Sequence, residues 1–86
     1  MGGILETAQV MRGSEAAGRS LGELELRRRT GATVLSIVRD EQPQPAPDGP
    51  TRLEAGDLLV LYGPHEAIDR ALDLLEPRAQ PTDGPV

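Results

Sequence analysis

The segment from 18 to 39, GRSLGELELRRRTGATVLSIVR, constrains the fold most, because signals for a capped helix, a turn and a strand follow one another without a spacer. Ser20 and Glu23 have the spacing of a capping box, in which each side chain binds a backbone amide at the start of a helix. Gly31 suits the left-handed turn that ends such a helix. The sequence therefore predicts a short helix that begins at Ser20 and ends before Thr30.

Two aliphatic runs predict buried strands. Residues 32–38 contain three β-branched apolar residues, and residues 58–62 read LLVLY. Because neither run alternates with polar residues, both faces of each strand are expected to be buried, with 32–38 as the central strand. Gly56 and Asp57 precede the second run as a turn, in which the Asp57 carboxylate accepts local amide hydrogen bonds.

The flanking segments complete an α+β pattern. Residues 4–11 alternate weakly, which is typical of an edge strand. Residues 41–50, EQPQPAPDGP, contain four prolines, so that a strand here can pair along one edge only. From Pro64, taken as the first residue of a helix, the chain places Ala67, Ile68, Ala71, Leu72 and Leu75 on one stripe, and Pro77 ends it. The predicted order is β-α-β-β-β-α, a small mixed β-sheet with two helices on one face.

The length of the chain limits how large a core it can build. Of the 86 residues, we expect 4–76 to form one domain and 77–86 to be a flexible C-terminal tail. A domain of this size buries only about 60% of its unfolded surface. The chain has no cysteine, and Tyr62 is its one aromatic residue. Self-association into a homodimer is therefore the expected source of further stability.

Composition also narrows the partners. All nine basic residues are Arg and there are fourteen acids, which gives a net charge of -5 and disfavours nucleic acid as a partner. No apolar run approaches the roughly 20 residues that cross a bilayer, so no direct membrane insertion is expected. The start, MGGILETAQV, lacks the pattern of a signal peptide. These features predict a cytoplasmic domain.

Catalytic and metal chemistry find little support in the sequence. His65 is the one histidine, and no carboxylate is identified that would orient it as a general base, so an exposed histidine is the expected outcome. Neither a zinc-ligand spacing nor a calcium-binding loop occurs. No G-x-G-x-x-G loop is present, so neither NAD nor ATP is expected as a cofactor. We expect a protein that is not an enzyme; a small enzyme would require a pocket around His65.

The arginine run 27–29 is the strongest functional candidate. Adjacent residues of a helix point about 100° apart, so the three side chains cannot all bind one anion. A guanidinium can donate two parallel hydrogen bonds to a phosphate, which makes one of them a candidate anion ligand. The alternative is that all three stabilise the carboxyl end of the helix.

The segment 18–39 and the later segment LEAGDLLVLYG at 53–63 together resemble the TrkA-C domain, the C-terminal lobe of the RCK (regulator of potassium conductance) family. The resemblance covers roughly residues 4–76. It implies an α+β sandwich that works as a homodimer and regulates a potassium channel, a potassium uptake system or a cation/proton antiporter, on the same or a separate chain.

The resemblance also implies a ligand site. In RCK C-terminal domains that bind cyclic di-AMP, the nucleotide lies at the two-fold dimer interface, and its phosphates meet an arginine that corresponds to Arg27. In these domains a polar residue, often Asn, stands at the position of Thr33, and a proline after the edge strand stands at the position of Pro47. The residues that make apolar contacts with the bases correspond to Leu26 and Ala32. Thr33 is shorter than Asn, and no aromatic residue is near to stack on adenine. The alternative is a ligand-free dimerisation module of a transporter or another membrane protein; no cofactor is required in either case.

Overall fold

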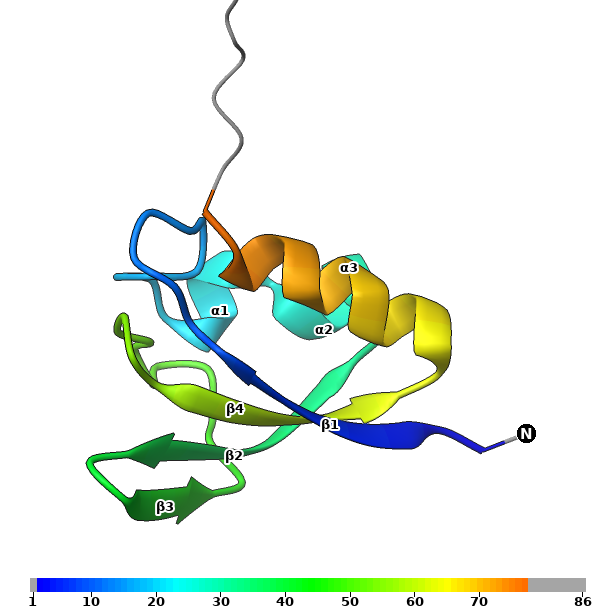
Figure 1. The fold of residues 1–86 in the computed structure, drawn as a ribbon, viewed down its shortest axis with the longest axis horizontal. Coiled ribbons are helices and arrows are strands. Elements are labelled where there is room, and N and C mark those ends of the chain that lie inside the picture. The colour runs from blue at the N-terminus through cyan, green and yellow to red at the C-terminus, as the bar shows by residue number, and fades with distance from the viewer. Residues whose placement is uncertain (1, 78–86) are drawn as a thin grey trace, which may run out of the picture.

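The computed structural model describes residues 2–77, so the predicted tail 77–86 lies outside the described residues except for Pro77, which forms an isolated bridge with Ser14. Figure 1 shows a four-stranded sheet with helices on one side. The elements in chain order are β1 (Ile4–Gln9), α1 (Leu21–Leu24), α2 (Leu26–Thr30), β2 (Thr33–Arg39), β3 (Gln42–Pro45), β4 (Leu58–Gly63) and α3 (His65–Leu75).

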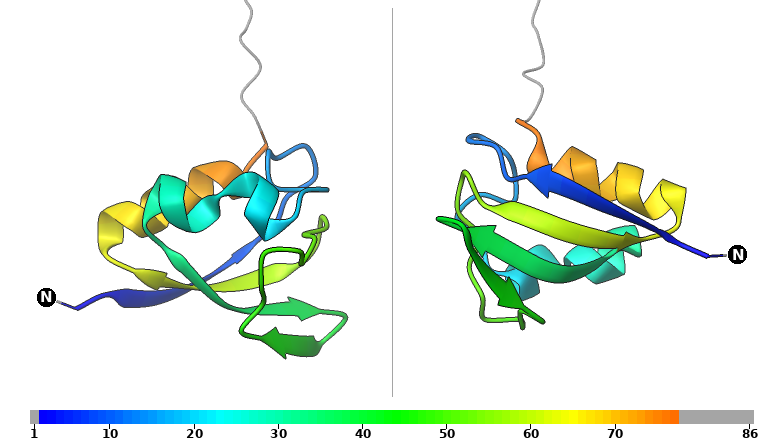
Figure 2. Two further views of the ribbon diagram at one scale, coloured as in Figure 1. Left: turned by 180° about the vertical axis from the view of Figure 1, so that it is seen from behind. Right: turned by 60° about the horizontal axis from the view of Figure 1, so that its bottom comes forward.

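The strand order in the sheet is β1-β4-β2-β3, and all three neighbouring pairs are antiparallel. The predictions of an α+β fold, of β2 in the interior of the sheet and of β1 and β3 at its edges are therefore confirmed. The prediction of a mixed sheet is wrong, because β4 inserts between β1 and β2 and runs opposite to both. The two views in Figure 2 show that the helices cover the same face of this sheet.

The proline-rich edge strand pairs as predicted, along one side only. β3 follows β2 through a two-residue turn at Asp40 and Glu41, whose φ values of 53° and 64° fit the left-handed turns typical of tight hairpins. Beyond the strand, the Ala46 amide donates to the Leu35 carbonyl at 2.9 Å. Proline has no backbone N–H, and the hydrogen bonds between β2 and β3 form without donors at Pro43 and Pro45.

The short helix is broken where the sequence predicted one continuous helix. The capping box forms, with Ser20 N donating to Glu23 Oε1 at 2.9 Å and Glu23 N donating to Ser20 Oγ at 3.1 Å. Glu25 then adopts a left-handed conformation (φ 54°) that separates α1 from α2. In a continuous helix, Leu24 and Leu26 would point about 200° apart. Because of the break, both leucines are buried. The break also divides the predicted helix in two, so the order of elements is β-α-α-β-β-β-α.

The ends of the other helical segments are close to those predicted. Gly31 ends α2 with φ 87° and donates its amide to the Arg27 carbonyl at 2.8 Å, which confirms the predicted left-handed turn. Pro64 lies one position earlier than expected, as the N-cap of α3 rather than its first residue. The predicted apolar stripe of α3 is buried together with Leu74, except that Leu72 is half-buried.

The core is aliphatic and lies between the sheet and the helices. Leu59 and Leu61 of β4 and Ile37 of β2 are fully buried and meet the apolar face of α3. Leu24 of α1 and Val10 and Leu53 from the connecting segments extend the core, each with no exposed surface.

The other face of the sheet is open, so the prediction that β2 and β4 are buried on both faces is wrong for a single copy. Leu58 and Tyr62 are 40% and 43% exposed, and Leu5, which pairs with Tyr62, is 62% exposed. No charged side chain occurs among the residues that the strand register places on this open face: Leu5, Thr7, Gln9, Thr33, Ser36, Val38, Pro43, Pro45, Leu58, Val60 and Tyr62.

A buried ion pair fixes the turn before β4. The Asp57 side chain is 2% exposed and accepts from Arg39 Nε at 2.8 Å and Arg39 Nη2 at 2.7 Å. It also accepts the Glu54 amide at 2.8 Å, which confirms its predicted role as a turn residue. Burial raises the pKa of Asp57, but the hydrogen bonds from Arg39 and Glu54 and the charge of Arg39 outweigh it, so that the pKa lies below its ordinary value.

We expect the Asp57→Asn variant to lower the free energy of unfolding by about 2–3 kcal/mol, because it leaves the half-buried Arg39 guanidinium with only a long ion pair, at 3.9 Å, to the exposed Glu54. Arg28→Ala, which breaks a solvent-exposed pair with Glu25, is the control and is expected to change stability by less than about 0.5 kcal/mol. Denaturant unfolding measures both. Equal losses in the two variants would contradict the assigned role of Asp57.

The lowered pKa of Asp57 also predicts an acid dependence of stability. Above its ordinary value of about 3.9 the carboxyl group is ionised in both the folded and the unfolded chain, and its contribution is complete. As pH falls toward the lowered native pKa, the unfolded chain binds a proton that the folded chain does not, so stability decreases. Unfolding measured from pH 6 to pH 2 is expected to show a steeper loss in the wild type than in Asp57→Asn, and parallel curves would refute this.

Candidate ligand-binding site

A pocket of about 370 Å³ lies between the α1–α2 pair, the start of β2 and the loop that follows β3. All five residues predicted as ligand contacts line it: Leu26 and Arg27 from α2, Ala32 and Thr33 at the start of β2, and Pro47 from the loop. Leu21, Gly22, Glu25, Arg28, Val34, Asp48 and Gly49 complete the lining. The structure therefore brings together side chains that lie far apart in the sequence, such as those of Leu26 and Pro47.

The loop wall of the pocket is attached to α1 through backbone hydrogen bonds. The Gly22 amide donates to the Gly49 carbonyl at 2.9 Å, and the Leu21 amide donates to the Thr51 carbonyl at 2.9 Å. Further along, Leu53 N donates to the Arg19 carbonyl at 2.8 Å. These bonds hold Pro47 beside the helices.

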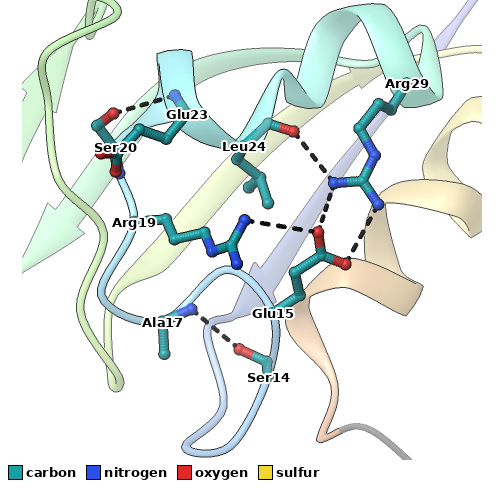
Figure 3. A network of polar contacts seen from close by, with 8 residues as sticks. All are labelled: Ser14, Glu15, Ala17, Arg19, Ser20, Glu23, Leu24 and Arg29. Atoms are coloured by element: carbon teal, nitrogen blue, oxygen red, sulfur yellow. Dashed lines mark hydrogen bonds and ion pairs between the residues drawn. The ribbon is translucent and has the colours of Figure 1, made fainter.

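The three arginines have different surroundings, as their directions on a helix require. Arg29 binds both carboxylate oxygens of Glu15, at 2.6 Å and 3.2 Å, and also donates to the Leu24 carbonyl (Figure 3). The hydrogen bond to Glu15 raises the pKa of Arg29. Arg28 pairs with Glu25 at 3.1 Å. Arg27 lines the pocket, and within residues 2–77 its side chain forms no hydrogen bond or ion pair, so its donors have no protein acceptor.

The pocket lining carries two acids that the sequence did not indicate. Glu25 pairs with Arg28, as described above. Asp48 accepts a hydrogen bond from the Thr51 hydroxyl at 2.9 Å, and its own carbonyl accepts the Thr51 amide at 3.0 Å. Their positions depend on the break after α1 and on the docking of the loop, neither of which leaves a signal in the sequence.

Other candidate chemistry is not supported by the geometry. The His65 side chain is 76% exposed, lies 3.6 Å from the Asp69 carboxylate and lines neither of the two pockets described, which argues against an active site around it. In the part of the chain that the structure covers, no cluster of three metal-type ligands occurs. None of the helices described is long and apolar enough to span a bilayer.

Comparison with known proteins identifies the family. The profile of the TrkA-C domain matches residues 5–76, which is most of the chain. The chain belongs to the TrkA-C domain family. TrkA-C domains are non-catalytic regulatory domains, so the prediction that this chain is not an enzyme is confirmed.

Two curated relatives of this TrkA-C domain belong to potassium transport systems. The Ktr system potassium uptake protein A of Vibrio alginolyticus is 33% identical over 75 residues, covering 87% of this chain and 34% of the relative. The K(+)/H(+) antiporter subunit KhtT of Bacillus subtilis is 31% identical over 70 residues, covering 80% of this chain and 42% of the relative. The TrkA-C domain thus spans less than half the length of the relatives it matches.

A solved structure agrees with the fold. The RCK_C domain dimer of Streptococcus agalactiae BusR in complex with c-di-AMP superposes with a TM-score of 0.77 and 27% identity, over 83% of this chain and 88% of that one. The predicted RCK C-terminal fold is therefore confirmed.

Close contact between Gly22 and Gly49 gives a test of how the pocket wall is held. A Cβ atom at Gly22 would lie 3.3 Å from the Gly49 carbonyl oxygen, whereas a Cβ at Gly49 would meet its nearest neighbour only at 4.0 Å. We therefore expect Gly22→Ala to displace the loop and to speed amide hydrogen exchange at Asp48, Gly49 and Thr51. Gly49→Ala is the control and is expected to leave exchange unchanged. Global stability would not isolate this contact, because alanine has a higher helix propensity than glycine and so stabilises α1 as well. Local exchange is therefore the measurement. Identical exchange in the two variants would contradict the described contact.

Proposed function

We propose that this TrkA-C domain is a cytoplasmic, ligand-sensing regulatory domain that controls potassium or other monovalent cation transport as a homodimer, and that it binds cyclic di-AMP between the two copies. The observation that carries the proposal is that Arg27, Leu26, Ala32, Thr33 and Pro47 line one pocket.

Arg27 supplies the main polar contact to the ligand. Its guanidinium can donate two parallel hydrogen bonds to a phosphodiester, and no protein acceptor in residues 2–77 competes for these donors. The Thr33 hydroxyl adds one donor, and Leu26, Ala32 and Pro47 offer apolar surface to a base. A volume of about 370 Å³ is near the lower end of the range for small-molecule pockets. It fits half of a cyclic dinucleotide, with the second half held by the partner copy.

Three features support the homodimer. The open face of the sheet carries no charge in a chain in which 27% of the residues are charged. Exposed Leu5, Leu58 and Tyr62 on that face offer apolar area to a second copy. A two-fold symmetric ligand matches two identical half-sites related by a two-fold axis.

Ligand binding regulates by shifting a conformational equilibrium. A nucleotide that touches both copies stabilises the dimer geometry in which the two pockets face each other. The size of the shift is limited by the difference in affinity between the two geometries. A transport protein attached to the domain, or bound to it as a separate chain, responds to that change in geometry.

The transport assignment is supported by the relatives, one named as a potassium uptake protein and one as a potassium/proton antiporter subunit. The partner is therefore a membrane cation channel, transporter or antiporter. We propose no direct membrane insertion and no nucleic-acid partner, since a net charge of -5 opposes binding to a polyphosphate.

A ligand-free dimerisation module is the second candidate. The observation in its favour is that Glu25 and Asp48 offset the charges of Arg27 and Arg28 in the pocket lining. In addition, no aromatic residue lines the pocket to stack on a base. In this case the open sheet face alone would pair the subunits.

Calorimetry with cyclic di-AMP separates these candidates. We expect binding by the wild type and a loss of affinity of about 10- to 100-fold in Arg27→Ala, because hydrogen bonds to charged groups contribute about 1.5–3 kcal/mol. Arg12→Ala removes the same charge from an exposed position outside the pocket and is expected to bind like the wild type.

Absence of heat from the wild type at millimolar nucleotide would leave the ligand-free module as the function. Equal affinities of Arg27→Ala and Arg12→Ala would place the ligand elsewhere.

A further inference from the structure

We propose that Asp48 is a specificity-determining residue of this pocket, which selects dinucleotides whose phosphates are all diesters and excludes those that carry a terminal phosphate. The inference rests on the proposed function, because it concerns the same pocket and deepens the choice of ligand.

Asp48 is held at the pocket wall. Its Oδ1 accepts a hydrogen bond from the Thr51 hydroxyl at 2.9 Å, and Thr51 is in turn attached to α1 by the bond from the Leu21 amide at 2.9 Å. The next residue, Gly49, accepts the Gly22 amide at 2.9 Å. The Thr51 hydroxyl thus binds the carboxylate, and the backbone that follows Asp48 is bonded to α1, which holds Asp48 at the loop wall.

The charges of the lining decide which anions fit. The charged lining residues are Glu25, Arg27, Arg28 and Asp48. Glu25 and Arg28 neutralise each other at 3.1 Å. One cation, Arg27, and one anion, Asp48, remain, and neither forms an ion pair within the described part of the chain. Each copy therefore offers one cation to one phosphate, which matches a cyclic dinucleotide with a single negative charge per half.

A terminal phosphate does not match this arrangement. A phosphomonoester carries about -1.5 to -2 charges at pH 7, against -1 for a diester. Arg27 can neutralise only one of these charges, and the remainder meets the Asp48 carboxylate of the loop wall. This repulsion is electrostatic and exposed to solvent, so salt screens it, with a Debye length of about 10 Å at 0.1 M and about 3 Å at 1 M.

The selectivity has a consequence for signalling. Hydrolysis of one diester in a cyclic dinucleotide adds water across a P–O bond: the phosphorus keeps the hydroxyl group and the released sugar oxygen takes the proton. The product is a linear dinucleotide with a terminal phosphate. A pocket that rejects this product would respond to the intact ring only, and ring opening by a phosphodiesterase would end the response.

The test compares the affinities of cyclic di-AMP and of the linear 5′-phosphorylated diadenylate by calorimetry at 0.1 M salt. For the wild type we expect the cyclic ligand to bind at least about tenfold more tightly. Asp48→Asn, whose amide oxygen can still accept from Thr51, is expected to reduce this ratio about fivefold, mainly through tighter binding of the linear ligand. At 1 M salt the wild-type ratio should fall toward that of the variant.

Asp40→Asn is the matched control, since it removes the same charge from the exposed turn between β2 and β3, where Asn tolerates the positive φ equally well. Its ratio is expected to equal that of the wild type. If the cyclic ligand binds but Asp48→Asn keeps the wild-type ratio, the role of Asp48 is refuted while the proposed function stands. If the wild type binds neither ligand, the proposed function fails and this inference fails with it.

Discussion

The buried carboxylate of Asp57 joins parts of the domain that lie far apart in the sequence. Its side chain binds Arg39 at the end of β2, and its carbonyl accepts the Val10 amide after β1 at 2.8 Å. In the same turn, the Gly56 amide donates a hydrogen bond to the Val10 carbonyl at 2.8 Å. Both interior strands and the connection after β1 are thereby fixed in register. The loop that forms one wall of the pocket runs directly into this turn, so the ion pair also supports the candidate site.

The break at Glu25 is the second constraint on the site. It lets Leu24 and Leu26 both enter the core. It also turns the chain, so that Arg27 and Arg28 line the pocket while Arg29 binds Glu15. A left-handed conformation costs a residue other than glycine roughly 1–2 kcal/mol. The burial of two leucines, at about 1.5–3 kcal/mol each, is large enough to offset that cost.

Much of the fold was predictable because its signals are local. The capping box at Ser20, the left-handed Gly31 and the prolines of β3 each act through the backbone of their own segment, and each is confirmed. The direction of β4, the break at Glu25 and the docking of Gly49 against Gly22 were not predicted, because they result from contacts between distant segments. Asp57 shows both cases: its turn role was visible in the sequence, whereas its partner Arg39, eighteen positions earlier, was not.

The candidate site divides in the same way. Family resemblance pointed to Arg27, Leu26, Ala32, Thr33 and Pro47, and the structure gathers them in one pocket, but Glu25 and Asp48 enter the lining only through tertiary docking. The most direct test of the account is an amide NMR titration of the wild type with cyclic di-AMP. The account predicts chemical-shift changes concentrated at residues 21–34 and at Asp48 and Gly49, with saturation at one nucleotide per two chains. Changes centred instead on the hollow between β1 and α3, lined by Ala8, Met11 and Leu72, or saturation at one nucleotide per chain, would contradict it.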